Sequence, residues 1–222
     1  MIDGKERIVM INFIPIFPLG VVVFPDEVLN LHIFEPRYKQ LVNDCYAEAK
    51  PFGIPTVLDN GVNEMGTLVE IIEIVEVYSD GKLDIRTKGL QVFKMLELVK
   101  TIPDKLYSGA IVNYPSNIIN KNISLMAVVL PLVKELHRLL NVQKNFKKPD
   151  AELVSYDIAH HIGLPVKEEY ELHGLMYESQ RLEYIRRHLQ KIIPIIKDAE
   201  NLKERIQLNG HFRELKGFNF DL

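Results

Sequence analysis

Residue types that enzymes use for catalysis lie close together in the segment LHIFEPRYKQLVNDC, residues 31–45. A histidine can act as a general base, a glutamate as a general acid, and a cysteine thiolate as a nucleophile. The segment holds one of each, with an arginine that could stabilise negative charge: His32, Glu35, Cys45 and Arg37. An active centre is therefore the first hypothesis to weigh.

The local pattern around these residues favours an architectural role. Pro36 suits the first turn of a helix, because its missing N–H would be unpaired there, and Glu35 places negative charge at the positive end of the helix dipole. Arg37 can form a local ion pair with Glu35. His32 lies in an apolar run without a matching nucleophile. We therefore predict a structural junction formed by His32, Glu35 and Arg37, and no catalytic residues.

Metal and nucleotide sites are not predicted either. Glu169 and His173 are four residues apart and could share a ligand, but the HExxH pattern is missing. The adjacent His160 and His161 would point in different directions from a helix. The stretch GVNEMGTL spaces two glycines as a phosphate-binding loop does, but Thr67 stands where the lysine is required. We expect no metal, no cofactor and no nucleotide hydrolysis.

Three side chains are candidates for noncovalent contact with a peptide. Phe24 and Pro25 precede the acidic pair Asp26-Glu27 and are unusually apolar for a loop, so they could form the rim of a groove. Tyr38 is amphipathic and close to the same junction, so it could serve as an anchor. Ordinary packing is the alternative for each of the three.

The distribution of charged residues bears on whether the chain binds nucleic acid. A basic stretch in the last predicted helix comprises Arg181, Arg186, Arg187, His188 and Lys191. A solvated helix face is the ordinary interpretation, and an acidic partner or an RNA phosphate is the other. The formal charge of the chain is −3, and its first 115 residues carry 11 Lys and Arg against 16 Asp and Glu. This excess of negative charge disfavours nucleic acid as a partner.

The elements that position these residues are β-rich in the first half of the chain. NFIPIFPLGVVVFP gives two apolar runs separated by a corner, and Asp80-Gly81 joins two alternating runs as a hairpin. LQVFKMLELV and YSGAIVNYP supply further strands, so a small closed or nearly closed barrel is predicted. A helix from Pro36 to the residue before Pro51 carries one apolar face: Tyr38, Leu41, Val42, Cys45, Tyr46 and Ala49.

The second half of the chain is predicted to be helical. Residues 122–140 are apolar at helical spacing, with a kink expected at Pro131. Asp150 would cap a helix through His161, and a last helix would stop or kink at Pro194. The predicted fold class is α+β, with a barrel subdomain over residues 1–117 and a helical subdomain over residues 118–222.

One apolar segment could suggest a membrane span, because Ile8–Pro25 contains no charged residue and follows Lys5 and Arg7. Two prolines and Gly20 would break such a helix, and no small-x-small cleavage pattern follows. We therefore predict buried strands here and no membrane partner. The single cysteine excludes an intrachain disulfide, so a cytoplasmic location is expected.

Two groups of residues match a known pattern. The first lies in IPIFPLGVVVFPDEVLNLHIFEPRYKQLVND, residues 14–44, and consists of Pro18-Leu19, Phe24-Pro25, Leu31, Phe34-Glu35 and Arg37-Tyr38. The second consists of Ser155, Ala159, Ile162-Gly163-Leu164, Ser179-Gln180-Arg181-Leu182 and Leu189. Together they span most of the chain, which resembles the amino-terminal, substrate-binding domain of Lon protease.

The resemblance implies a PUA-like small β-barrel with one inserted helix, followed by a C-terminal helical bundle. In the full protease this region recognises substrate proteins, and an ATPase and a serine–lysine peptidase domain follow it. The 222 residues leave no room for these domains. We therefore expect a free-standing, non-catalytic module that binds partner proteins or unfolded or degron-bearing polypeptides. RNA binding is the alternative function, because PUA-like barrels also occur in RNA-binding proteins. A hydrolase activity is the third hypothesis.

Overall fold

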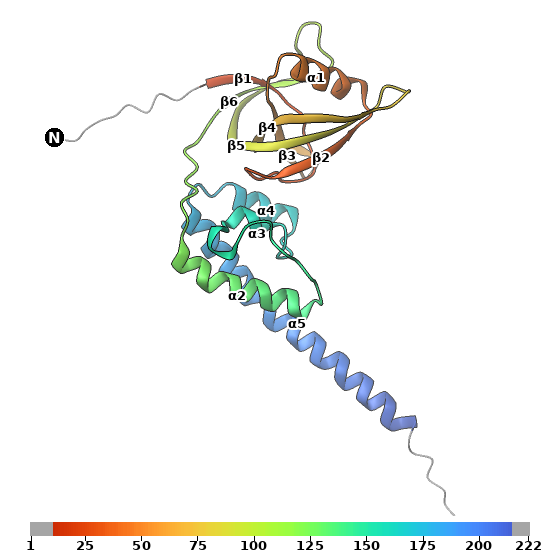
Figure 1. Ribbon diagram of the computed structural model, residues 1–222, viewed down its shortest axis with the longest axis vertical. Coiled ribbons are helices and arrows are strands. Elements are labelled where there is room, and N and C mark those ends of the chain that lie inside the picture. The colour runs from red at the N-terminus through yellow and green to blue at the C-terminus, as the bar shows by residue number, and fades with distance from the viewer. Residues whose placement is uncertain (1–10, 215–222) are drawn as a thin grey trace, which may run out of the picture.

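An antiparallel sheet with one inserted helix forms the first half of the described chain, and helices form the second half (Figure 1). The computed structural model describes the backbone of residues 11–214 and the side chains of residues 11–206. The α+β class and this order of elements are confirmed. Residues 1–10 and 215–222 lie outside the described residues, and with them Lys5 and Arg7 before the apolar segment.

Within residues 11–214, six strands build the sheet in the order β1-β6-β5-β4-β3, and β2 pairs with the first part of β5. The strand β5 is therefore central, since it also pairs with β4 and, at its other end, with β6. The elements of this β unit are β1 (Ile11–Pro15), β2 (Val28–Ile33), α1 (Pro36–Ala47), β3 (Phe52–Leu58), β4 (Gly61–Val77), β5 (Leu83–Val99) and β6 (Gly109–Asn113).

The edge strands β1 and β3 are linked by the segment that directly follows β1. Isolated parallel bridges join Ile16 to Gly53 and Leu19 to Thr56, both on β3. The backbone N–H of Phe17 donates to the Gly53 carbonyl at 2.8 Å. These contacts satisfy backbone groups that an open strand edge would leave unpaired. Closure of the whole sheet into a barrel stays a prediction.

The hairpin of β4 and β5 turns at the predicted Asp80-Gly81. Gly81 has a φ of +76°, a conformation that other residues rarely adopt. Each of the two strands contains 17 residues, so the segments predicted as separate strands on either side of Gly89 form one continuous β5. The pairing of β4 with β5 changes register three times, and such irregularities bend and twist a strand pair.

The helix α1 begins at Pro36, as predicted, and buries most of its predicted apolar face against the sheet. The buried residues are Tyr38, Leu41, Val42 and Cys45. Two predicted members of the face are not buried there. Tyr46 is 50% exposed, and Ala49 lies beyond the helix end with a φ of +49°. The helix therefore ends earlier than its apolar pattern indicates.

The helices of the second half form a helical unit in which α2 and α5 lie side by side, while the end of α5 extends away from the rest (Figure 1). Its elements are α2 (Ile123–Leu139), a 3-10 turn (Asp150–Glu152), α3 (Ser155–Ala159), α4 (Val166–His173) and α5 (Glu178–Glu214). Among the helices described within residues 11–214, none is both long and apolar enough to cross a bilayer.

The helices differ from the sequence predictions in three places. The expected single helix from Asp150 to His161 is divided into the 3-10 turn and α3. The sequence pattern did not reveal α4. Of the two outcomes predicted at Pro194, the stop is wrong, because α5 continues through this proline, which lies on the exposed side of the helix where its ring meets solvent. The kink stays a prediction.

Among the described side chains, the buried ones form three clusters, two in the β unit and one in the helical unit. The helical cluster also contains Val22 and Phe24, which belong to the chain between β1 and β2. The two units therefore share this cluster. The predicted division at residue 117 falls in the segment that connects β6 to α2, and it stays a prediction.

Candidate functional site

The structure places the predicted rim residues Phe24 and Pro25 inside the molecule. Phe24 is only 1% exposed, and its ring lies 5.0 Å from that of Tyr156 and 4.7 Å from the imidazole of His160, measured between centroids. Pro25 is buried as well. Neither is open to a polypeptide in this arrangement, so their role as peptide contacts stays a prediction. Phe24 packs between the two units.

The third predicted contact, Tyr38, is also buried. Its ring stacks on Phe17 at a centroid distance of 3.9 Å, and the guanidinium of Arg37 lies 4.4 Å from the ring centroid. Arg37 Nε in turn donates to the Glu35 carboxylate at 2.8 Å. The residues 35–38 therefore form one local cluster at the start of α1. A contact of Tyr38 with a peptide, and the junction role of Glu35 and Arg37, stay predictions.

His32 lies apart from this cluster, on the exposed face of β2. Its Nδ1 is 2.6 Å from the Asp84 carboxylate, which also accepts a hydrogen bond from the Tyr78 hydroxyl at 2.6 Å. Hydrogen bonds from Tyr78 and His32 lower the pKa of Asp84 below its ordinary value. The hollow beside them is lined further by Asn30, Leu31, Val75, Ile85 and Arg86. None of these five side chains is a nucleophile that the pair could activate.

Cys45 lies buried on the apolar face of α1. Its side chain is 3% exposed, and burial raises the pKa of the thiol to about 12. A thiol reacts as the thiolate, which this environment disfavours at neutral pH. The candidate active centre of the opening segment is therefore dispersed over an exposed strand, a helix start and a buried helix face.

A hydroxyl and an imidazole do meet between the two units, where Thr67 Oγ1 lies 2.9 Å from His173 Nε2. Both side chains are fully buried, and the Thr67 hydroxyl donates its proton to the carbonyl of Val23. The imidazole therefore acts as donor to Thr67 rather than as its base. Without access for a substrate, this pair is a structural contact.

His160 connects the units electrostatically. Its Nδ1 lies 2.8 Å from the Glu169 carboxylate on α4, and its Nε2 lies 3.1 Å from the Glu27 carboxylate of the β unit. Burial opposes the charge on His160, but hydrogen bonds to the two carboxylates outweigh it and raise the pKa to about 9. The described side chains contain no group of three or more His, Cys, Asp or Glu residues arranged to hold a metal ion.

Arg181 differs from the prediction of a solvated basic face. Its side chain is fully buried, donates to the Glu178 carboxylate at 2.9 Å, and lies 4.3 Å from the Tyr156 ring centroid. It also donates to the carbonyl of Ile118 at 3.0 Å, in the segment before α2. A guanidinium can satisfy five such contacts at once, so Arg181 fixes the start of α5 against the connecting segment.

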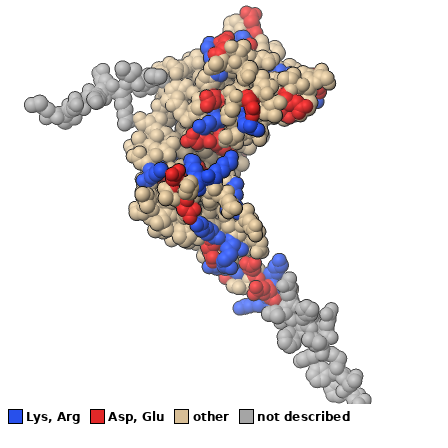
Figure 2. All heavy atoms as spheres, in the orientation of Figure 1, with Lys and Arg blue, Asp and Glu red and all other residues tan. Residues whose placement is uncertain are grey.

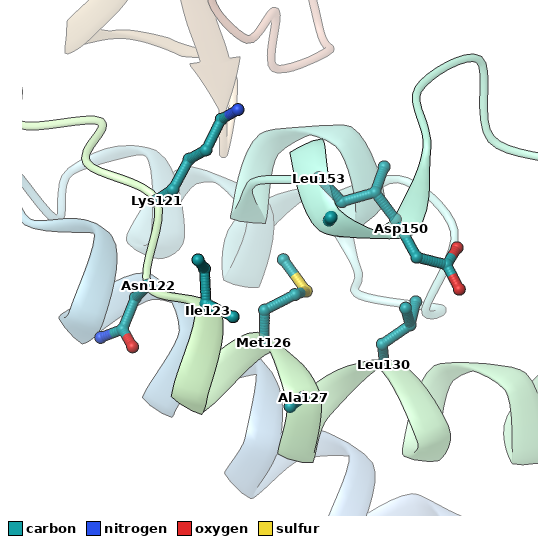
Figure 3. A pocket seen from close by; sticks show the side chains of 9 residues that line it. Lys121, Asn122, Ile123, Met126, Ala127, Leu130, Asp150 and Leu153 are labelled. Atoms are coloured by element: carbon teal, nitrogen blue, oxygen red, sulfur yellow. The ribbon is translucent and has the colours of Figure 1, made fainter.

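An apolar hollow of about 200 Å³ lies between the first turns of α2 and the segment that carries the 3-10 turn. Side chains from one face of α2 point toward that segment, with Lys121 and Asp150 at the two ends (Figure 3). The lining residues are Lys121, Asn122, Ile123, Met126, Ala127, Leu130, Asp150, Ala151 and Leu153. The floor of the hollow is apolar, and Ile123 at its edge is exposed. No other part of the described chain covers this apolar surface.

The hollow continues at both ends along α2. Toward the start of α5 it meets a depression that contains Tyr177, which is 54% exposed. In the other direction it meets a depression formed by Ala127, Pro131 and Lys134. We call the hollow and its two continuations the α2 groove. Its shape suits an extended segment that lies along the helix with one side chain in the hollow.

The charges around the α2 groove are mostly paired with each other. Lys134 Nζ lies 2.6 Å from the Asp150 carboxylate, and Arg138 Nε lies 2.9 Å from that of Glu135. Lys121 has no carboxylate within ion-pair distance among the side chains of residues 11–206. On the face shown in Figure 2, Lys and Arg are interspersed with Asp and Glu instead of forming one basic patch.

Sequence reasoning missed the α2 groove. A signal was present, because the stretch ISLMAVVLPLVKEL carries apolar residues on more than the one face that packs against α5. Ile123, which lines the groove, is 70% exposed, which an ordinary amphipathic helix does not require. Locating the hollow also needs the position of Leu153, which the sequence pattern alone does not provide.

These features define an α+β domain with an apolar surface groove. The model of the ATP-dependent protease La (Lon) substrate-binding domain matches residues 14–191 of the chain. The chain therefore belongs to this family. No curated protein matches the sequence.

Two solved structures show the same fold. A Lon N-terminal domain protein from Xanthomonas campestris is 22% identical, with a TM-score of 0.55 over 82% of this chain and 98% of that one. The N-terminal domain of the Mycobacterium avium complex Lon protease is 12% identical, with a TM-score of 0.59 over 81% of this chain and 98% of that one. At these identities the similarity concerns the fold.

Proposed function

We propose that this chain binds unfolded or degron-bearing polypeptides noncovalently, in the α2 groove. Membership of the Lon substrate-binding family supports the binding of polypeptides in general. The observation that carries the choice of site is the uncovered apolar hollow over Met126, Leu130 and Leu153. Burial of one large apolar side chain there would contribute about 1.5–3 kcal/mol.

The proposed binding involves no covalent chemistry. A bound segment would gain from apolar burial in the hollow and from contacts with the residues that line its two continuations. Met126 is suited to such a site, because an unbranched thioether adapts to side chains of different shape. The groove therefore favours recognition of a class of segments over a single sequence.

Fluorescence anisotropy with a reduced, alkylated and therefore permanently unfolded polypeptide tests the proposal. The unchanged chain is expected to bind it saturably. Ala127→Glu places a carboxylate at the mouth of the hollow and is expected to weaken binding at least tenfold, because that charge would have to be desolvated. Ala127 is exposed, so the fold tolerates the change.

The matched control is Val128→Glu, on the same helix at a position that is 51% exposed and does not line the groove. This variant is expected to bind as the unchanged chain does. Equal loss in both variants, or no binding by the unchanged chain, would overturn the proposed function.

A further inference from the structure

We infer that the α2 groove selects segments in which a large apolar residue lies next to an acidic one, with Lys121 recognising the acid. This inference rests on the proposed function and adds the class of segment that the groove accepts. It is carried by two observations at the same place: an apolar hollow of limited size, and a cation at one of its ends.

The size of the hollow determines what fits. Its volume of about 200 Å³ is smaller than the 300–1,000 Å³ that is typical of sites for drug-sized ligands and cofactors. The space suits one large side chain, because its floor is apolar and its polar residues, Lys121, Asn122 and Asp150, are few. Met126, Leu130 and Leu153 are each less than 10% exposed and form its floor. The occupant is therefore a single leucine-sized or phenylalanine-sized side chain of an extended segment.

The charges around the hollow determine what lies beside that side chain. Every carboxylate along the α2 groove already has a cation: Asp150 is paired with Lys134, Glu135 with Arg138 and Lys197, and Glu178 with Arg181. A basic residue of a bound segment would therefore find these carboxylates occupied. Within the described part of the chain, Lys121 is the groove cation without such a partner.

The position of Lys121 determines where the acid of the segment would lie. It lines both the hollow and the depression that contains Tyr177, so it stands between the apolar anchor site and the start of α5. An acidic residue close to the anchor, on the side of the segment that faces α5, would lie within reach of its flexible four-carbon side chain. The opposite side of the hollow, with its paired charges, offers no equivalent attraction.

The expected preference is modest, because Lys121 is exposed. Exposed ion pairs of this kind change affinity by about two- to fivefold, and salt weakens them. Replacing the apolar anchor by serine is expected to cost at least tenfold, since the hollow would then remain unfilled. The anchor therefore provides most of the affinity, and Lys121 provides the selection among segments that carry one.

The test uses the full chain and three labelled peptides with the same glycine–serine framework. One carries leucine flanked by aspartate, the second leucine flanked by lysine, and the third serine flanked by aspartate. The unchanged chain is expected to bind the first about two- to fivefold more tightly than the second at low salt, and the third at least tenfold more weakly than the first. Lys121→Glu is expected to reverse the order of the first two.

The control is Lys167→Glu, which changes an exposed lysine on α4 that does not line the groove and should leave the order unchanged. If the two leucine peptides bind equally, or keep their order in Lys121→Glu, the selection by Lys121 is overturned while the proposed function stands. If the unfolded polypeptide binds but none of the peptides does, the selection is again overturned. If the unfolded polypeptide also fails to bind, the proposed function itself is overturned.

Discussion

The imidazole of His173 on α4 donates a hydrogen bond from Nε2 to the hydroxyl oxygen of Thr67 on β4, at 2.9 Å. The direction follows from the Thr67 hydroxyl, whose own proton goes to the carbonyl of Val23. Burial, with a further contribution from the charge of Arg181, lowers the pKa of His173 to about 3, so the ring is neutral at pH 7. The sheet and the helical unit are thus joined by a polar contact that bulk water does not reach.

Removing the Thr67 hydroxyl is expected to destabilise the fold. Thr67→Val keeps the shape of the side chain but leaves the His173 N–H without an acceptor, which should cost about 1–3 kcal/mol in the free energy of unfolding. Urea denaturation at pH 7 measures this value. The control, Thr101→Val, changes an exposed threonine and should alter the same free energy by no more than about 0.5 kcal/mol. Similar values for the two variants would contradict the assigned hydrogen bond.

The contact of His160 with Glu27 and Glu169 is expected to make stability fall at alkaline pH. The pKa of His160 is about 9 in the folded chain, above its ordinary value of 6.5. The unfolded chain therefore loses this proton first as pH rises, so the stabilising contribution is complete below pH 6.5 and disappears as pH passes through about 9.

Urea midpoints of the unchanged chain and of His160→Gln, measured at pH 6 and pH 9.5, test this pH dependence. The variant is expected to be less stable at pH 6, and the difference between the two proteins should shrink at pH 9.5. A difference of the same size at both pH values would show that the charge of His160 does not contribute.

Phe24 is expected to contribute to stability through its packing against the helical unit. Phe24→Ala removes a ring that is 1% exposed and leaves a cavity beside Tyr156, which should cost about 3–5 kcal/mol in the free energy of unfolding. The matched change, Phe34→Ala, concerns a ring that is 59% exposed and should cost far less. Thermal denaturation of both variants checks the comparison, and a mild effect of Phe24→Ala would mean that the two units do not share a core.

The turn that positions Phe24 depends on the lack of a side chain at Gly89. A Cβ at this position would lie 2.2 Å from the carbonyl oxygen of Phe24, and the backbone of Gly89 is held by hydrogen bonds with Asp26 and Glu27. Gly89→Ala is therefore expected to destabilise the chain by about 1–3 kcal/mol. Gly20→Ala, where a Cβ would meet no atom within 4 Å, should leave the urea midpoint unchanged or slightly raised.

Local sequence patterns predict the turns and helix starts that depend on the conformational properties of one or two neighbouring residues. The Asp80-Gly81 hairpin forms where predicted because Gly81 supplies the positive φ, and α1 starts at Pro36 because that position requires no N–H. The break after the 3-10 turn at Asp150–Glu152 is different, since it depends on how Leu153 packs in the helical core. Patterns within a window of a few residues do not contain that information.

The candidate site depends on contacts between residues far apart in the sequence. Arg181 belongs to a charged stretch that indicates a solvated face, but its partners Ser155 and Asn117 lie 26 and 64 positions away. In the same way, a loop sequence shows that Phe24 is apolar but not that α3 and α4 will cover it. The family resemblance indicated the class of function, and the location of an open apolar surface required the packed structure.

The insertion of Phe24 into the helical core also sets an order of events during translation. The amino-terminal strands leave the ribosome first, so the ring of Phe24 meets water until residues 155–173 have been synthesised. The nascent sheet would thus expose an apolar aromatic ring, which becomes buried only when the helices that follow it in the sequence pack against it. A synonymous codon change that delays those helices would lengthen the interval in which chaperones, or neighbouring nascent chains, compete for it.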